Sequence, residues 1–259
     1  MIDYTGAKAI SIPHRMENGF SFNADELLSL INDKTRLIIL NSPANPTGGV
    51  VPDEELRKLS LGLEKFPNVF ILSDEIYSRI LFDNNQHATL LSYPEIFDKV
   101  IVLDGWSKTY AMTGWRLGYG IFPKAIFEFA EKLAINCHSC VNSSAQFAGI
   151  EALKGSQKDV EKMVNEFTKR RNFLVDELNK IENIECLKPG GAFYVFPKIL
   201  KGNMNSKDIA KELLEKKFVA TVPGSSFGHN GENFIRISYA NNIENLKKSI
   251  ERIKEFVYE

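Results

Sequence analysis

Val69-Phe70-Ile71-Leu72-Ser73-Asp74-Glu75-Ile76-Tyr77 is a short apolar run that ends in polar residues. An unbroken apolar run of this length is typical of a strand that is buried on both faces of a parallel sheet. Asp74 stands at the carboxyl end of the run, and the carboxyl ends of strands are where α/β sheets bind ligands. The stretch therefore predicts a buried strand at 69–73 whose end presents a carboxylate to a binding crevice.

The sequence on either side of this strand alternates between strand and helix patterns. Apolar runs predict further parallel strands at 36–41 and 100–104, with 117–122 as another candidate. Helical patterns accompany them at 24–31, 53–66, 124–136 and 142–153. This alternation is typical of an α/β protein.

The pattern changes towards the carboxyl end. Apolar residues at helical spacing over 159–181 predict one long helix that joins two domains. Beyond it we expect a strand at 192–196 after Gly190-Gly191, a helix at 206–216, strands at Val219 and at 234–239, and a helix at 243–258. We therefore expect a large domain over residues 1–165 and a smaller α+β domain over 166–259.

The composition argues against several classes of protein. The formal net charge is -1 and the basic residues are scattered among acidic ones, so nothing favours nucleic-acid binding. No run approaches the roughly 18 apolar residues of a membrane span. The odd cysteine count suits a reducing compartment, and we expect small buried thiols at Cys137, Cys140 and Cys186. Three isolated histidines lack metal-ligand spacing and are expected on the surface or in loops: His14, His87 and His229. The protein is expected to be cytoplasmic, without a metal.

Lys108 lies in an unusual setting. It belongs to the run Ser107-Lys108-Thr109-Tyr110-Ala111-Met112-Thr113-Gly114-Trp115-Arg116-Leu117-Gly118-Tyr119, which is rich in aromatic and small residues. A buried ammonium is costly and responds by losing its proton. A neutral lysine amine is a nucleophile towards carbonyl groups, so Lys108 is the predicted catalytic residue.

Other polar residues follow the predicted strands and are expected to meet Lys108 in one crevice. The ligand that fits them has an aldehyde for Lys108, an anionic group for Arg116, a ring nitrogen for Asp74, and a phenolic oxygen for Tyr77 and Asn45. Pyridoxal 5'-phosphate has all four groups, and a lysine with an aspartate on the pyridinium nitrogen is how proteins hold it.

Four motifs resemble the class I and II aminotransferases of the aspartate aminotransferase family, which are fold-type I pyridoxal-phosphate enzymes. These motifs are Asn45-Pro46-Thr47-Gly48, Ser73-Asp74-Glu75-Ile76-Tyr77, Ser107-Lys108 through Arg116, and Phe234-Ile235-Arg236-Ile237-Ser238-Tyr239. They occur in the family's order and cover nearly the whole chain. The resemblance implies a three-layer α/β/α large domain followed by a smaller C-terminal α+β domain.

The resemblance also implies a role for each matching residue. Lys108 would form the imine with the cofactor and then move a proton between the substrate α-carbon and the cofactor. Asp74 would pair with the ring nitrogen, and Arg236 would clamp the substrate α-carboxylate, to which a bidentate guanidinium is suited. The remaining implied contacts are to the phosphate from Ser107 and Arg116, to the phenolic oxygen from Tyr77 and Asn45, and to the substrate from Asn45. Two further family-like segments, 189–194 and 223–228, are read as turn and packing elements with possible contacts to substrate.

The resemblance begins partway into the family's pattern, so the chain resembles an amino-terminally truncated aminotransferase. The absent part would carry the phosphate-binding turn, the aromatic that stacks on the cofactor ring, and a residue that reaches the partner subunit. We therefore expect exposed apolar surface where that part packs, and weak cofactor binding by this chain alone.

The implied activity is transfer of an amino group between an L-amino acid and a 2-oxo acid of the aspartate, aromatic or alanine type, in a homodimer. The same cofactor and fold also support β-elimination, decarboxylation and racemisation. A poorly active remnant is a further alternative. The motifs are the same for each of these and leave them open.

Overall fold

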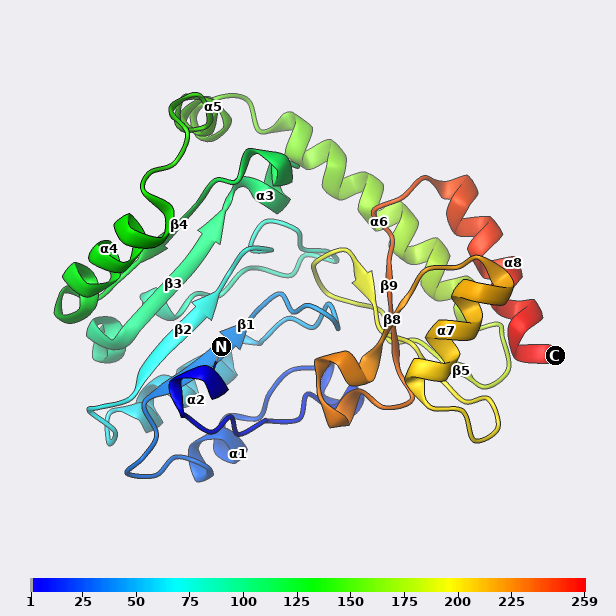
Figure 1. Cartoon of the computed structure of the whole chain (residues 1–259), viewed down its shortest axis with the longest axis horizontal. Helices are drawn as coiled ribbons and strands as arrows, with labels where there is room; N and C mark the ends of the chain where they lie inside the picture. Colours follow the sequence, from blue (N-terminus) through cyan, green and yellow to red (C-terminus); the bar gives the residue numbers. More distant parts are fainter. Residues whose placement is uncertain (1) are drawn as a thin grey trace.

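The computed structural model describes residues 2–259, and its first half is built on a four-stranded sheet (Figure 1). The strands are β1 (Leu37–Asn41), β2 (Phe70–Asp74), β3 (Val100–Gly105) and β4 (Gly118–Ile121), in that spatial order. β1, β2 and β3 are parallel, and β4 runs antiparallel to β3. The register pairs Asn41 with Asp74 and Asp74 with Leu103, so the polar strand ends meet at one edge.

Two helices cover one face of this sheet. α1 (Ala24–Ser29) begins at Asn23, whose side chain accepts a hydrogen bond from the Glu26 amide. α2 (Asp53–Leu63) follows Pro52 and starts with three acidic residues, which suit the positive end of the helix dipole. Its buried positions include Leu56, Leu59 and Leu63, spaced to lie on one face. They pack with apolar residues of β1, β2 and β3 in one hydrophobic cluster.

The segment after β3 carries much exposed apolar surface. It contains α3 (Trp106–Thr109), α4 (Lys124–His138) and α5 (Ser143–Lys154). α4 buries none of its residues, and all four residues of β4 are exposed. The expectation of a buried parallel strand at 117–122 is wrong in direction and in burial. β4 returns directly from the one-turn helix α3, and a connection without a full crossover helix gives an antiparallel neighbour.

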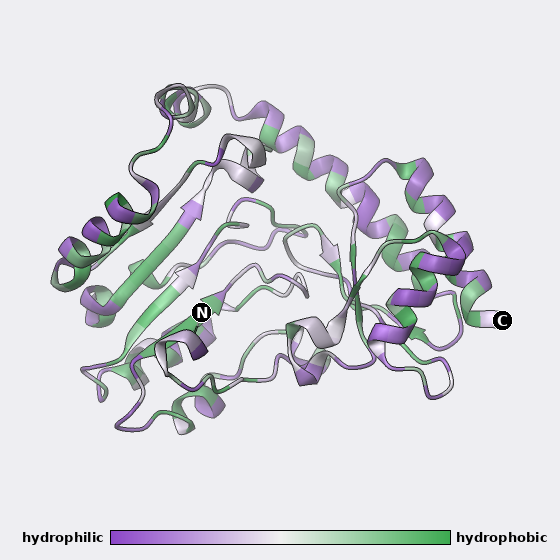
Figure 2. Ribbon diagram, in the orientation of Figure 1, coloured by the Kyte–Doolittle hydropathy of each residue, from purple (hydrophilic) through white to green (hydrophobic). Residues whose placement is uncertain are grey.

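The carboxyl-terminal part has its own hydrophobic cluster. The long helix α6 (Lys158–Leu178) runs from α5 to this part and packs on α8 (Ile243–Tyr258), as Figure 1 shows. The remaining elements are β5 (Ile184–Glu185), β6 (Tyr194–Val195), β7 (Lys198–Ile199), α7 (Ser206–Lys217), β8 (Val222–Pro223) and β9 (Ile235–Ser238). β6, β9 and β8 form an antiparallel sheet in that order. Apolar stripes alternate with polar residues along α6 and α8 in Figure 2, because each helix buries one side.

Most expected elements are present, with ends that differ by a few residues. Val219 is buried, but the strand there is β8, three residues later. Cys186 is buried as expected, whereas Cys137 and Cys140 are exposed. Cys137 lies on α4, which buries none of its residues, and Cys140 follows two residues after this helix ends. Within residues 2–259, no helix combines the length and apolar character that a bilayer span requires. The same residues hold no group of three or more His, Cys, Asp or Glu side chains placed to bind a metal ion.

Candidate functional site

The loop after β1 carries Asn45 to the carboxyl edge of the sheet. Asn41, the last residue of β1, accepts a hydrogen bond from the Asn45 amide at 2.8 Å and donates its side-chain amide to the Asp74 carbonyl at 3.0 Å. One side chain thus fixes the loop against the end of β2. Gly48 closes the loop with a φ of 68°, and a Cβ there would lie 2.4 Å from Pro189. The turn therefore requires glycine, for its backbone conformation and for close approach.

Asp74 ends β2 as a half-buried carboxylate. Its Oδ1 accepts a hydrogen bond from the Ile76 amide at 3.2 Å, and it forms no ion pair within residues 2–259. Burial raises the pKa of the Asp74 carboxyl, and the neighbouring charge of Glu75 raises it further. A desolvated carboxylate in this position favours a cationic or N–H-bearing ligand group beside it.

Tyr77 lies one turn beyond Asp74 and is buried in an aromatic group. Its hydroxyl lies 3.1 Å from the hydroxyl of Tyr194, and its ring meets Phe193 edge to face with centroids 5.5 Å apart. Burial and the Tyr194 contact raise the pKa of the Tyr77 phenol, so it stays protonated at neutral pH. The Nζ of Lys108 lies 5.9 Å from the centroid of Phe193. Tyr77, Phe193 and Tyr194 thus connect the lysine segment to the C-terminal sheet.

Arg236 extends from β9 over the other side of Tyr194. Its guanidinium carbon lies 4.5 Å from the Tyr194 ring centroid and 5.2 Å from that of Phe227. Nη1 donates a hydrogen bond of 2.8 Å to Oδ1 of Asn45. The buried Nε has no hydrogen-bond partner among the described residues. A buried guanidinium N–H without an acceptor is costly, so an anionic group beside this side chain would be favourable.

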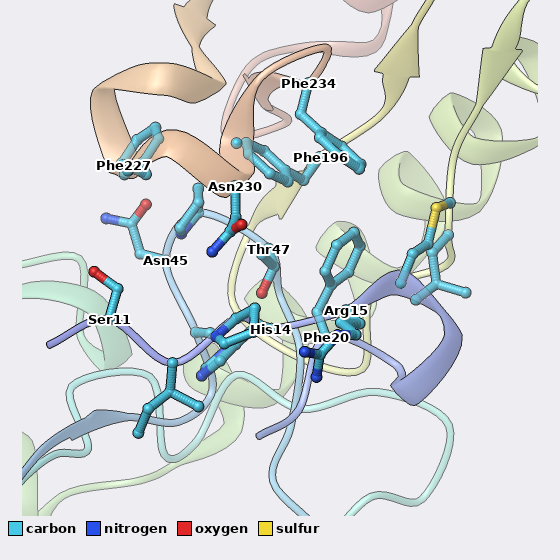
Figure 3. A pocket seen from close by; sticks show the side chains of 18 of the residues that line it. Ser11, His14, Arg15, Phe20, Asn45, Thr47, Phe196, Phe227, Asn230 and Phe234 are labelled. Atoms are coloured by element: carbon cyan, nitrogen blue, oxygen red, sulfur yellow. The ribbon is translucent and has the colours of Figure 1, made fainter. Parts of the chain in front are cut away.

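A cavity of about 790 Å³ opens beside Asn45. Asn45 and Phe227 lie together on its wall in Figure 3, and the stacked rings of Phe196 and Phe234, 5.0 Å apart, form another part. His14 also lines it, and burial lowers the pKa of the His14 imidazole. Asn45 therefore borders a space that is partly aromatic and large enough for a small ligand, whereas Arg236 is not among the residues that line it.

The segment that contains Lys108 begins where the backbones of β3 and β4 approach each other closely. A Cβ on Gly105 would lie 2.9 Å from the Gly118 Cα, so glycine is needed where β3 and β4 approach each other. α3 then carries Ser107 and Lys108, both half-buried, for a single turn. Arg116 follows in a left-handed conformation, is exposed, and donates Nη1 to the Thr113 carbonyl at 3.0 Å. It lines a second cleft, of about 960 Å³, with residues that include His138 and Asn142.

Some of the predicted residues are connected by direct side-chain contacts, which we call the contact series. Phe193 and Tyr194 form its middle and contact Lys108, Tyr77 and Arg236, and Arg236 in turn contacts Asn45. Asp74 is tied to the Asn45 loop through its carbonyl. Ser107 and Arg116 stand apart from this series. The pattern of 189–194 predicts a turn with possible ligand contacts. In the structure, Tyr194 pairs with Ser238 on β9, and this pairing places the Tyr194 ring between Tyr77 and Arg236.

Comparisons with known proteins give a consistent result. The model of the family described as aminotransferase class I and II matches residues 1–253. A putative aminotransferase, YugH, of Bacillus subtilis is 38% identical over 258 residues, 100% of this chain and 66% of its own. An aspartate aminotransferase of Pyrococcus abyssi is 37% identical, over 98% of this chain and 65% of its own. The crystal structure of an aromatic aminotransferase from Pyrococcus horikoshii matches with a TM-score of 0.93 at 37% identity, covering 97% of this chain and 68% of that one. The chain therefore spans just under two thirds of the length of these curated relatives.

Proposed function

Because the chain belongs to the class I and II aminotransferase family, we propose that it transfers an amino group between an L-amino acid and a 2-oxo acid with pyridoxal 5'-phosphate as cofactor. The observation that carries the proposal is the placement of Lys108 and Arg236 on either side of the Phe193 and Tyr194 pair. An amine and a carboxylate-binding guanidinium at the two ends of one aromatic wall suit an amino-acid substrate.

The chemistry of Asp74 fits the proposed cofactor. A carboxylate that is half-buried, hydrogen-bonded to one backbone amide and free of ion pairs within residues 2–259 lacks a cationic partner. The protonated ring nitrogen of pyridoxal phosphate would supply it. When bound, the cofactor withdraws the electrons of the bond that breaks at the substrate α-carbon. Asp74 would hold the ring-nitrogen proton in place and so keep that withdrawal strong.

Lys108 is the proposed catalytic residue. It forms no salt bridge to any residue of 2–259, and its closest described aromatic partner is Phe193. Its amine would hold the cofactor aldehyde and, once released, would move the proton at the substrate α-carbon as general acid and base. Tyr77, protonated and buried, would donate a hydrogen bond to the phenolic oxygen of the cofactor, with Asn45 beside it.

Arg236 is the proposed substrate-carboxylate residue. Its unpartnered Nε and its Nη atoms are the donors that a carboxylate accepts in a bidentate contact. Ser107 and Arg116 are proposed to bind the cofactor phosphate. Arg116 is exposed and has no carboxylate partner among the described residues, which supports a role in anion binding.

The finer architecture belongs to the same proposal. We place a large three-layer domain at residues 1–165 and a small domain at 166–259, with α6 crossing the boundary. We also propose a homodimer in the cytoplasm. Sedimentation velocity tests the dimer, because a monomer across the micromolar range contradicts it.

The test of the function uses visible absorbance. Pyridoxal phosphate added to the chain is expected to give an absorbance band that Lys108→Ala abolishes and that the exposed-site control Lys132→Ala keeps. Loaded protein is then offered amino acids, and keto acid, ammonia and carbon dioxide are scored separately. Keto acid with amino transfer supports the proposal, whereas ammonia or carbon dioxide indicates a lyase or decarboxylase. A band that survives in Lys108→Ala contradicts the assignment of the lysine.

A further inference from the structure

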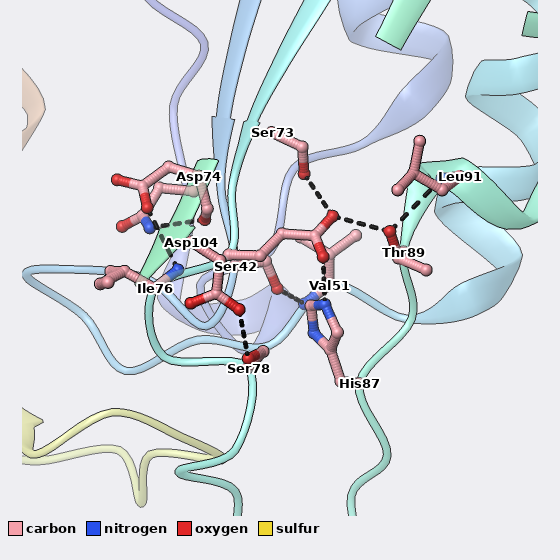
Figure 4. Close-up of polar contacts among 12 residues, drawn as sticks. Ser42, Val51, Ser73, Asp74, Ile76, Ser78, His87, Thr89, Leu91 and Asp104 are labelled. Carbon is pink, nitrogen blue, oxygen red and sulfur yellow. Dashed lines mark hydrogen bonds and ion pairs between the residues drawn. The ribbon is translucent and has the colours of Figure 1, made fainter. Parts of the chain in front are cut away.

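A buried carboxylate lies directly behind Asp74 and is not used by the proposed chemistry. Glu75 is 6% exposed. Its Oε1 accepts hydrogen bonds of 2.9 Å from the hydroxyls of Ser73 and Thr89, and its Oε2 lies 2.7 Å from Nε2 of His87. Figure 4 shows Ser73, Thr89 and His87 approaching this carboxylate from different sides. Because an ionised carboxylate only accepts, Nε2 of His87 carries the shared proton.

His87 reaches Glu75 from a segment distant from the strand ends. Twelve positions separate the two residues, and the intervening chain loops away from β2 before Thr89 returns beside the same carboxylate. His87 was expected to be an ordinary loop or surface histidine. His87 does lie in a loop, but its ring is only partly exposed and its Nε2 lies within hydrogen-bonding distance of the Glu75 carboxylate.

The charges around this pair are almost all negative. Asp74 adjoins Glu75 at the end of β2, Asp104 is the second-last residue of β3, and the Tyr119 hydroxyl of β4 lies 3.5 Å from Asp104. Among the described residues, the only nitrogen of a basic side chain within 4 Å of the Glu75 carboxylate is Nε2 of His87. Burial raises the pKa of both Asp74 and Asp104, and the charge of Glu75 raises both further. His87 acts in the opposite direction on Asp104.

We propose that His87 is a positioning residue for the cofactor site, which offsets the charge of Glu75 so that Asp74 keeps its own negative charge for the ring nitrogen. This inference rests on the proposed function. Two adjacent carboxylates repel each other most where water is excluded. The N–H that His87 directs at Oε2 offsets part of the Glu75 charge, so Glu75 repels the charge of Asp74 less strongly. Without it, Asp74 takes up a proton more readily and no longer holds a protonated nitrogen.

The experiment separates charge from shape. His87→Leu removes the N–H donor and keeps a side chain of similar size, and the double variant Glu75→Gln with His87→Leu removes the carboxylate charge as well. The matched control Lys162→Gln removes a cation from an exposed pair with Asp159 on α6. The dissociation constant for pyridoxal phosphate is measured for each protein by the absorbance titration over a series of pH values, with circular dichroism as a check of folding.

The expected results are specific to the charge. His87→Leu moves the loss of cofactor binding on acidification to a higher pH, by about one pH unit for each unit by which the pKa of Asp74 rises. The double variant binds within about threefold of the wild type, and the control is unchanged. A double variant that loses binding at the same raised pH as His87→Leu, or a His87→Leu protein with the wild-type pH dependence, overturns the inference. Failure of the wild type to bind the cofactor through Lys108 contradicts the proposed function instead.

Discussion

Arg236, the proposed carboxylate-binding residue, is held in place by its neighbours. Tyr194 and Phe227 hold the guanidinium through its faces, and Asn45 orients one of its nitrogens. The contacts with the two rings fix the plane of the guanidinium group. Its Nε has no hydrogen-bond acceptor among the described residues. Lysine at this position keeps the charge but loses the planar fork and the stacking on the rings.

We therefore expect Arg236→Lys to lower kcat/KM for the amino acid by about 10-fold to 100-fold, since a charge-assisted hydrogen bond contributes roughly 1.5–3 kcal/mol. The loss should fall mainly on KM, because the carboxylate is bound equally in the ground and transition states. Steady-state kinetics measure it, with Arg252→Lys on the exposed side of α8 as the control. Cofactor affinity should remain unchanged, and a tenfold loss of cofactor binding would instead place Arg236 in the cofactor site.

At this scale the sequence predicted the polar residues of the site better than its aromatic ones. Asn45, Asp74 and Lys108 each follow a predicted strand, so their shared edge could be inferred from parallel pairing. Tyr194 could not be placed this way. Its contact with Tyr77 spans 117 residues and depends on the pairing of β6 with β9, which no local pattern encodes.

Among the elements, α6 is held by a buried arginine. Arg171 is 0% exposed, makes hydrogen bonds of 2.8 Å from both Nη atoms to Asp83, and donates another to the Pro189 carbonyl. Its guanidinium also lies 4.5 Å from the Phe82 ring centroid. This arrangement ties the middle of α6 to the chain beyond β2 and to the turn that precedes β6.

We expect Asp83→Asn to lower the free energy of unfolding by about 2 kcal/mol at neutral pH, because Arg171 then keeps a buried charge without its counter-ion. The effect is smaller than for a fully buried pair, since Asp83 is half-exposed. The Arg171 hydrogen bonds hold the folded-state pKa of Asp83 below its ordinary value of 3.8. A lowered carboxyl pKa stabilises the fold above that value and stops doing so as the pH falls through the folded-state pKa.

The difference between wild type and Asp83→Asn should therefore be constant from neutral pH down to about pH 5 and shrink below 3.8. Urea unfolding at a series of pH values measures it. Asp159→Asn, on an exposed ion pair of the same helix, is the matched control and should change stability by less than about 0.5 kcal/mol. An equal loss in both variants would show that Arg171 is stabilised without Asp83.

Helices were predicted to within a few residues because their apolar spacing and caps are local. The direction of β4 could not be predicted, because the apolar pattern of 117–122 is the same for a parallel and an antiparallel strand. The short connection from α3 to β4 decides the direction of the strand. The same limit applies to burial, because α4 has an amphipathic pattern that predicts a packed face, yet none of its residues is buried among residues 2–259.

The molecule as a whole exposes apolar residues unevenly. Phe129 and Leu133 on α4 are 74% and 65% exposed, and Phe147 on α5 is 74% exposed. By contrast, Leu59 on α2 is fully buried against the sheet. Exposed side chains of this size favour association or dye binding, because burying them removes roughly 1.5–3 kcal/mol of unfavourable contact with water for each.

We expect Phe129→Glu combined with Leu133→Glu to reduce hydrophobic-dye fluorescence and to raise the concentration at which the chain aggregates. The change places charges where the side chains already meet solvent, so the free energy of unfolding should stay within about 0.5 kcal/mol. Leu59→Ala, as the buried comparison, should lose about 2–5 kcal/mol and increase dye binding. Dye titration, light scattering and urea unfolding measure the three effects. A loss of more than about 1 kcal/mol in the double glutamate variant would contradict the exposure of α4, because only a face that is covered in solution depends on these two side chains for stability.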